Sequence, residues 1–180
     1  MKNKSKNFTP ILIITILFAT LLSACSKNSI ALQTNPEKVN KSAEQMVSFV
    51  LPTGFVPEVS AEMMGYTLVS YKGTEDMSHL YFVQSENQAD EENLSEMFEK
   101  LSPGSFDRNN RSKILETKTI SVRGEEATLI ISEAINGEGN DYRQAMVVFQ
   151  GKNGPTLLVF SEPVENWNQL TVENLISSIE

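Results

Sequence analysis

Few residues in this chain have the type and spacing that catalysis or metal binding would need. The 180 residues include one cysteine, Cys25, and one histidine, His79. A zinc site needs several convergent Cys, His or carboxylate ligands, and a catalytic imidazole needs partners within hydrogen-bond reach. His79 directly precedes the apolar run 80–83, so we interpret it as a histidine at the end of a strand. The sequence therefore predicts no metal, no cofactor and no catalytic centre built on these two residues.

One short segment has the composition of a site for a hard cation. Asn136, Glu138, Asn140 and Asp141 bring four oxygen-bearing side chains together within six residues, and oxygen ligands suit Ca²⁺. The spacing differs from that of an EF-hand loop. Asparagine and glycine also accept positive φ at low cost, so the same segment favours a hairpin turn. The turn is our interpretation, and a weak calcium site within 136–141 is left open.

The acidic runs 90–92 and 125–126 are the other groups that could do chemistry. Paired carboxylates serve as acid and base when their environments separate their pKa values. Acidic residues also belong at the first turn of a helix, which is how we interpret 90–92, and at an exposed strand edge, which is how we interpret 125–126. An enzyme with an unrecognised carboxylate site is therefore our third functional hypothesis.

The lone cysteine follows the parts of an export signal. Lys2, Lys4 and Lys6 precede the apolar run 11–22, and that run is too short for a membrane-spanning helix, which needs about 20 residues. The four residues 22–25, Leu-Ser-Ala-Cys, resemble the lipobox of bacterial lipoproteins. This resemblance implies that a signal peptide, 1–24, is cleaved between Ala24 and Cys25. It also implies that the Cys25 thiol carries diacylglycerol and that the new amine receives a fatty acid such as palmitate.

The same resemblance implies a location in the cell envelope. Several acyl chains anchor a protein to a bilayer, whereas one chain binds only marginally. Ser26 stands where an aspartate commonly marks retention in the inner membrane of diderm cells. We therefore expect the outer membrane, facing the periplasm, if the cell has one, and otherwise the outer face of the cell membrane. The lipid bilayer is thus the first expected partner, through acylated Cys25.

The charge of the mature chain excludes one class of partner. Removing Lys2, Lys4 and Lys6 leaves 12 basic residues against 23 acidic ones, a net charge of −11. Such a surface repels phosphate backbones and anionic head groups, so nucleic acid is not expected as a partner. With no second cysteine, no disulfide can form within the chain, and an apolar core has to stabilise the domain.

The hydrophobic pattern predicts a flexible tether over 25–45 and one domain over 46–180. The tether is polar and lacks a sustained period. In the domain we expect an α+β fold with a central antiparallel sheet of about six or seven strands and flanking helices. The helices are expected at 90–101, where an apolar stripe begins at Leu94, and from 161–163 to the C-terminus, with a break near Asn168 and a cap at Thr171 as the alternative. The expected strands are 46–51, 66–71, 80–83, 114–122, 127–135, 142–149 and 156–160, the last of them central because it is almost wholly apolar.

Two segments carry a resemblance to a known domain family. Residues 49–55, Phe-Val-Leu-Pro-Thr-Gly-Phe, are similar to the opening of PsbP-like and DcrB-like domains. The end of the chain, with Trp167 and the closing run 175–179, is also similar. The resemblance covers about 46–180 and implies an α/β/α sandwich. It implies an accessory or scaffold role rather than a catalytic one, and it supplies no active-site motif.

These observations lead to a non-catalytic interaction or accessory domain, anchored in the envelope and bound to an envelope protein of unknown identity. The alternative is a periplasmic module that binds a small or apolar ligand between the sheet and a helix. Phe55 and Phe106 fall in predicted loops, so we expect these two aromatic side chains to be the exposed candidates for an interaction surface.

Overall fold

A computed structural model describes residues 31–63, 65–87, 94, 113–136 and 138–180. The expected signal peptide 1–24, Cys25, Phe106 and, apart from Leu94, the helix expected at 90–101 lie outside these residues. Within them, no helix is long and apolar enough to cross a membrane.

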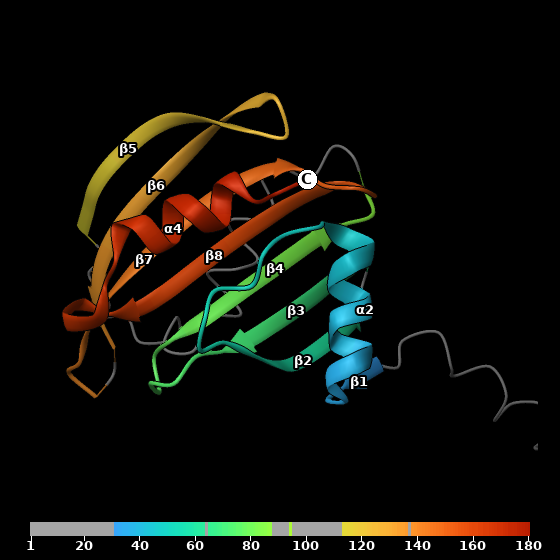
Figure 1. Cartoon of the computed structure of the whole chain (residues 1–180), viewed down its shortest axis with the longest axis horizontal. Helices are drawn as coiled ribbons and strands as arrows, with labels where there is room; N and C mark the ends of the chain where they lie inside the picture. Colours follow the sequence, from blue (N-terminus) through green and yellow to red (C-terminus); the bar gives the residue numbers. More distant parts are fainter. Residues whose placement is uncertain (1–30, 64, 88–93, 95–112, 137) are drawn as a thin grey trace, which may run out of the picture. The chain divides into compact units, whose positions relative to one another are not determined.

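The fold is built on one antiparallel sheet with the strand order β1-β2-β3-β4-β8-β7-β6-β5. Two four-stranded meanders, β1–β4 and β5–β8, join where β4 pairs with β8 (Figure 1). The antiparallel α+β class is confirmed, but the sheet has eight strands and is larger than predicted. The strands are β1 Ala31–Gln33, β2 Val56–Met63, β3 Tyr66–Lys72, β4 His79–Ser85, β5 Lys113–Val122, β6 Glu125–Ile135, β7 Asp141–Gln150 and β8 Pro155–Pro163.

Strand β8 occupies the centre of the sheet, as its apolar sequence predicted. It pairs with β4 on one side and with β7 on the other. Every residue from Pro155 to Ser161 is buried, because both faces of the strand are covered. Strands buried on both faces read as continuous apolar runs, which is why this one could be identified from the sequence.

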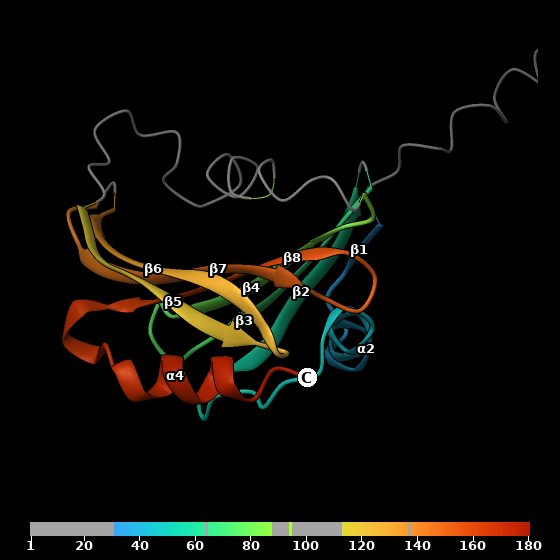
Figure 2. The same cartoon turned by 90° about the horizontal axis from the view of Figure 1, so that it is seen from above.

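Two α-helices, α2 Pro36–Met46 and α4 Gln169–Ser177, lie on the same face of the sheet (Figure 2). The main core fills the space beneath them and includes side chains from both helices and from strands β3, β4 and β6–β8. A second, smaller cluster lies on the other face of the sheet and consists of Val83, Leu157 and Val159 together with Leu94.

Helix α2 occupies residues that the sequence assigned to a flexible tether, so that prediction is wrong for residues 31–45. Asn35 caps the helix by accepting the backbone N–H groups of Glu37 and Lys38, and a proline stands in the first turn. The polar composition concealed the buried face of the helix, which consists of Val39, Ala43 and Met46. These three lie four and three residues apart, the spacing of one helix face.

The strand predicted at 46–51 is also absent, because this segment does not join the sheet. The backbone N–H of Ser48 donates to the Glu180 carbonyl at 3.3 Å, and the N–H of Glu180 donates to the Ser48 carbonyl at 2.9 Å. Val50 N–H donates to the Ser178 hydroxyl at 2.9 Å. The end of the chain therefore holds this segment across the helix-covered face.

Helix α4 begins later than the predicted terminal helix. Pro163 ends β8, a short 3-10 helix η2 spans Val164–Asn166, and Asn168 caps α4 by accepting the N–H of Leu170 at 3.0 Å. The predicted break near Asn168 is confirmed. The cap predicted at Thr171 is wrong, because Asn168 already accepts the first free N–H group.

Candidate functional site

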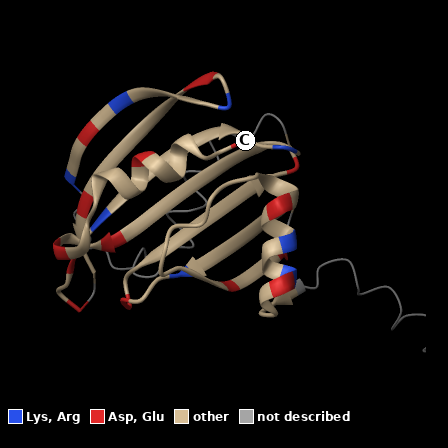
Figure 3. Cartoon of the chain, in the orientation of Figure 1, with Lys and Arg blue, Asp and Glu red and all other residues tan. Residues whose placement is uncertain are grey.

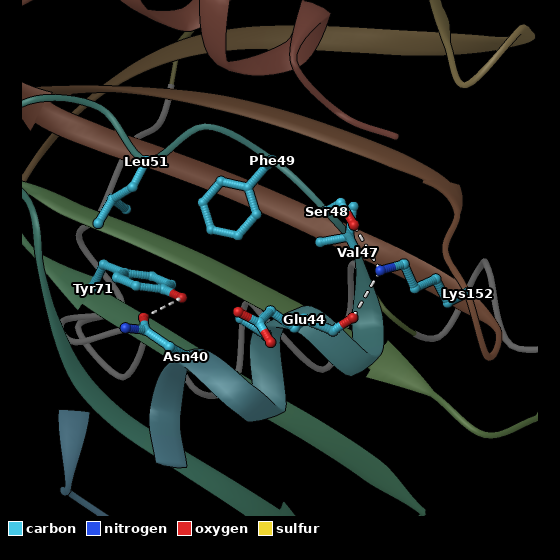
Figure 4. Close-up of a pocket in the computed structure, with 9 residues that line it drawn as sticks. Asn40, Glu44, Val47, Ser48, Phe49, Leu51, Tyr71 and Lys152 are labelled. Carbon is cyan, nitrogen blue, oxygen red and sulfur yellow. Dashed lines mark hydrogen bonds between the residues drawn. The ribbon is translucent and has the colours of Figure 1, made fainter. Parts of the chain in front are cut away.

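A pocket of about 530 Å³ opens between α2, the 47–51 segment and β3 (Figure 4). One side of it is apolar and the other is polar. The lining residues are Asn40, Ala43, Glu44, Val47, Ser48, Phe49, Leu51, Tyr71 and Lys152.

The β7–β8 turn fastens the end of α2 that borders this pocket. The backbone N–H of Lys152 donates to the Met46 carbonyl at 2.8 Å, and Lys152 Nζ donates to the Glu44 carbonyl at 2.9 Å. Asn153 Nδ2 donates to the Gln45 carbonyl at 2.9 Å. These are carbonyls of the last helical turn, which no residue within the helix can satisfy. The Lys152 ammonium group also lies at the negative end of the helix dipole.

A glycine allows the turn to approach the helix so closely. A Cβ atom at Gly151 would lie 2.5 Å from Gln84 Nε2 and 2.9 Å from the Met46 carbonyl oxygen. Gln84 Nε2 itself donates to Thr156 Oγ1 at 2.8 Å and to the Met46 carbonyl at 3.3 Å. These buried hydrogen bonds connect β4, β8 and the end of α2. They therefore stabilise the position of α2, which forms one side of the pocket.

Aromatic rings form the apolar side of the pocket. The Phe49 ring lies edge-on to Tyr71, with 5.7 Å between the ring centroids, and its centroid is 4.6 Å from that of Phe82. These separations are in the range of favourable aromatic pairs. Phe49 is half-buried and so keeps part of its surface open to the pocket.

The polar side of the pocket centres on the Tyr71 hydroxyl. This hydroxyl donates to Asn40 Oδ1 at 3.2 Å. Burial, together with the negative charge of Glu44, raises the pKa of Tyr71 to about 12. The phenol is therefore a neutral hydrogen-bond donor at physiological pH. The Glu44 carboxylate lies near it, on the α2 side of the pocket (Figure 4).

His79 lies in a second, smaller hollow of about 140 Å³. It begins β4, as predicted, and its ring stacks on Tyr81 with the centroids 5.5 Å apart and the planes 10° apart. Burial lowers the pKa of His79, and the nearby Glu58 acts in the opposite direction. The Ser161 hydroxyl donates to the Met77 carbonyl at 3.1 Å and so stabilises the loop that precedes β4. The hollow is lined by Asp76, Met77, His79, Tyr81, Asn136, Tyr142, Gln144 and Ser161.

Phe55 does not form an interaction surface, so this prediction is wrong. Its side chain is only 8% exposed, and its ring packs against Phe160 with the centroids 5.5 Å apart. The reason is a tight turn in which the Phe55 N–H donates to the Pro52 carbonyl at 3.2 Å and the chain turns back into the core. Phe106, Ala24 and Cys25 are the other predicted site residues, and they lie outside the described residues.

The 136–140 segment forms the predicted hairpin turn. The Asn136 side-chain oxygen accepts the N–H of Glu138 at 3.0 Å and that of Asn140 at 2.9 Å. This side chain therefore holds the turn itself. Among the residues that the structure describes, no group of three or more His, Cys, Asp or Glu side chains could hold a metal ion.

Among the residues that the structure describes, two carboxyl groups have clearly shifted pKa values, and their causes are separate. Burial raises the pKa of Glu162 in β8. Hydrogen bonds from Gln169 and Lys118 lower the pKa of Glu173 in α4. Neither carboxyl perturbs the other, and the acidic residues are spread over several elements (Figure 3). The enzyme hypothesis would need two carboxyl groups that perturb each other.

The sequence did not identify the residues of the larger pocket. Asn40 and Glu44 fall in the predicted tether, and Lys152 falls in the Gly-Lys-Asn-Gly run 151–154, whose composition predicts a turn between the strands expected at 142–149 and 156–160. The available signal was Asn35-Pro36 followed by the helical spacing of Val39, Ala43 and Met46. No protein-family model matches this chain, and neither does any curated protein.

Proposed function

We propose that this protein is a lipid-anchored component of the bacterial envelope whose domain is a non-catalytic interaction module. The lipobox-like run ending at Cys25 carries this proposal, together with the export signal before it. The first strand of the domain begins at Ala31, six residues after Cys25. A chain of this length spans about 20 Å at most, because an extended residue covers about 3.3–3.6 Å. The domain would therefore work close to the membrane surface, on an envelope protein there.

The same proposal specifies the membrane to which the domain is attached. In a cell with an outer membrane the domain would face the periplasm from that membrane, and otherwise it would lie on the outer face of the cell membrane. A strongly acidic domain is repelled by anionic lipids, so the acyl chains would have to hold it there. We also propose the PsbP-like α/β/α arrangement. The buried Leu94 packs with Val83 and Val159 on the face opposite α2 and α4, where a helix over 90–101 would supply the third layer.

Binding of a small ligand is the second candidate function, and the pocket beside α2 favours it. A volume of about 530 Å³ falls in the range of about 300–1,000 Å³ that small-molecule sites occupy. Its combination of an aromatic wall and a few polar groups is also typical of such sites.

The anchor is tested by changing Cys25→Ala in the full chain and feeding the cells labelled palmitate. Wild-type protein should carry the label and fractionate with membranes, because Cys25 supplies the acylated thiol and amine. Cys25→Ala should be unlabelled and should remain an uncleaved precursor or become soluble. Ser29→Ala, four residues further on, is the matched control and should behave as wild type. A processed, membrane-bound Cys25→Ala protein would contradict the proposal.

The interaction role is tested by crosslinking the acylated protein in cells and identifying what purifies with it. One reproducible envelope protein is the expected result. If no protein is captured and a small molecule stays bound to the purified domain, the second candidate replaces the first.

A further inference from the structure

We propose that the pocket beside α2 binds a small amine, whose ammonium group meets the Glu44 carboxylate and whose apolar body lies against Phe49. This inference rests on the second candidate function, ligand binding, and adds the chemical class of the ligand.

The first step is the charge balance of the lining residues. Glu44 is the carboxylate among them, it is exposed, and it faces the pocket (Figure 4). Lys152 is the cation among them, but its Nζ donates to the Ser48 hydroxyl at 2.7 Å and to the Glu44 carbonyl at 2.9 Å. Because Lys152 is held by these two oxygens at the negative end of α2, it is less available to a ligand than the exposed Glu44 carboxylate, which can take a cationic partner.

The second step is the aromatic wall beside that carboxylate. An ammonium group held near the face of an aromatic ring is attracted by the ring quadrupole. The half-buried Phe49 ring supplies the surface open to the pocket, and Tyr71, only 2% exposed, packs edge-on behind it with 5.7 Å between the ring centroids. The Tyr71 hydroxyl donates a hydrogen bond to Asn40, and the negative charge of Glu44 helps to raise the pKa of this phenol. The carboxylate and the rings therefore act on the same small volume.

The third step excludes an anionic ligand. Residues 31–180 contain 11 basic and 23 acidic side chains, a net charge of −12. A domain of this net charge disfavours anions, and the Glu44 carboxylate adds a local repulsion on its side of the pocket, opposite Lys152 in the charge it carries. A neutral molecule could use the aromatic wall but would leave the carboxylate without a charged partner.

The experiment compares three probes of similar shape on the purified full chain, with binding followed by titration calorimetry. Phenethylamine is the cation, 2-phenylethanol is the neutral analogue and 3-phenylpropionate is the anion. We expect phenethylamine to bind about tenfold more tightly than the alcohol at low salt, since an ion pair and a cation–π contact together supply about that factor. The preference should shrink as salt is added, and the anion should bind weakest.

Glu44→Gln removes the charge and keeps the shape of the side chain. It should abolish the preference for the amine and leave binding of the alcohol unchanged. Glu62→Gln is the matched control, because Glu62 is exposed on β2 and does not line the pocket, and it should keep the wild-type preference. Equal binding of amine and alcohol, or an unchanged preference in Glu44→Gln, would overturn the amine class while leaving ligand binding intact. If no probe binds, ligand binding at this pocket fails as well, while the palmitate test of the anchor is unaffected.

Discussion

The two helices cover the same face of the sheet in different ways. Helix α4 packs closely on its end of the sheet, with Val172, Leu175 and Ile176 buried in the main core. Helix α2 buries Val39, Ala43 and Met46 but leaves a pocket between itself and the 47–51 segment. The packed helix thus serves stability, and the helix beside the pocket is where a ligand could enter.

The difference follows from what holds each helix in place. Helix α4 is short and partly apolar, so burial of its side chains positions it. Helix α2 is largely polar, and its C-terminal end is held by the hydrogen bonds from Lys152, Asn153 and Gln84. The backbone of α2 lies close to β2 and β3, and the pocket lies between α2 and the 47–51 segment.

The largest expected effect is on the closely packed helix. Leu175→Ala should lower the free energy of unfolding by about 2–5 kcal/mol, since Leu175 is only 2% exposed and its loss leaves a cavity. Leu170→Ala, on the same helix, should change it by less than about 0.5 kcal/mol because Leu170 is 62% exposed. Urea unfolding followed by circular dichroism measures both. Equal effects of the two substitutions would mean that α4 is not packed as described.

A smaller effect is expected where α2 is fastened. Gly151→Ala should cost about 1–3 kcal/mol, because the added methyl group meets Gln84 and the Met46 carbonyl in a closed space. Asn153→Ala removes one exposed hydrogen bond from the same turn and should cost about 0.5–1.5 kcal/mol. The same unfolding assay ranks the two. If Gly151→Ala is neutral, the network beneath α2 is looser than its distances indicate.

The smallest effect concerns His79, whose side chain projects from the face of the sheet opposite to Tyr71 and the pocket beside α2. Because burial lowers its pKa from 6.5, the unfolded chain takes up a proton before the folded protein does. The free energy of unfolding should therefore fall as the pH drops from about 7.5 through 6.5 towards the lowered value. His79→Gln should flatten that slope in urea titrations at several pH values.

Glu162 provides the control for this pH dependence. Its raised pKa gives the opposite slope just above its ordinary value of 4.5, so Glu162→Gln should steepen the loss of stability on acidification in that range. Neither substitution should alter phenethylamine binding, because neither residue lines the pocket beside α2. An unchanged slope in His79→Gln would assign the pH dependence to other groups.

Several elements could be predicted from local pattern alone. Strand β8 was identified by its apolar run, the turn at 136–140 by its Asn and Gly residues, and the hairpin strands β6 and β7 by their apolar content on either side of that turn. Strand β2 was missed because its residues alternate weakly and Pro57 lies within it. The register shift between Pro57 and Val59 accommodates this proline, which a regular central strand would exclude.

The pocket could not be predicted, because its residues come from segments far apart in the chain. Asn40 and Glu44 come from α2, Tyr71 from β3 and Lys152 from the β7–β8 turn. Helix α2 is itself short and polar, and such helices depend on tertiary contacts for most of their stability. The sequence predicts the turn at 151–154 but not its contact with the end of α2, because that contact joins segments 108 positions apart.

The sequence by itself determined the strong negative charge, the antiparallel α+β class and the central position of β8, because each depends on composition or on short-range pattern. Only the tertiary structure decided that Phe55 is buried, that residues 36–46 form a helix and that a carboxylate and two aromatic rings share one pocket. These features depend on contacts between residues many positions apart, and burial and capping by distant segments outweigh the weak local preferences of polar sequence.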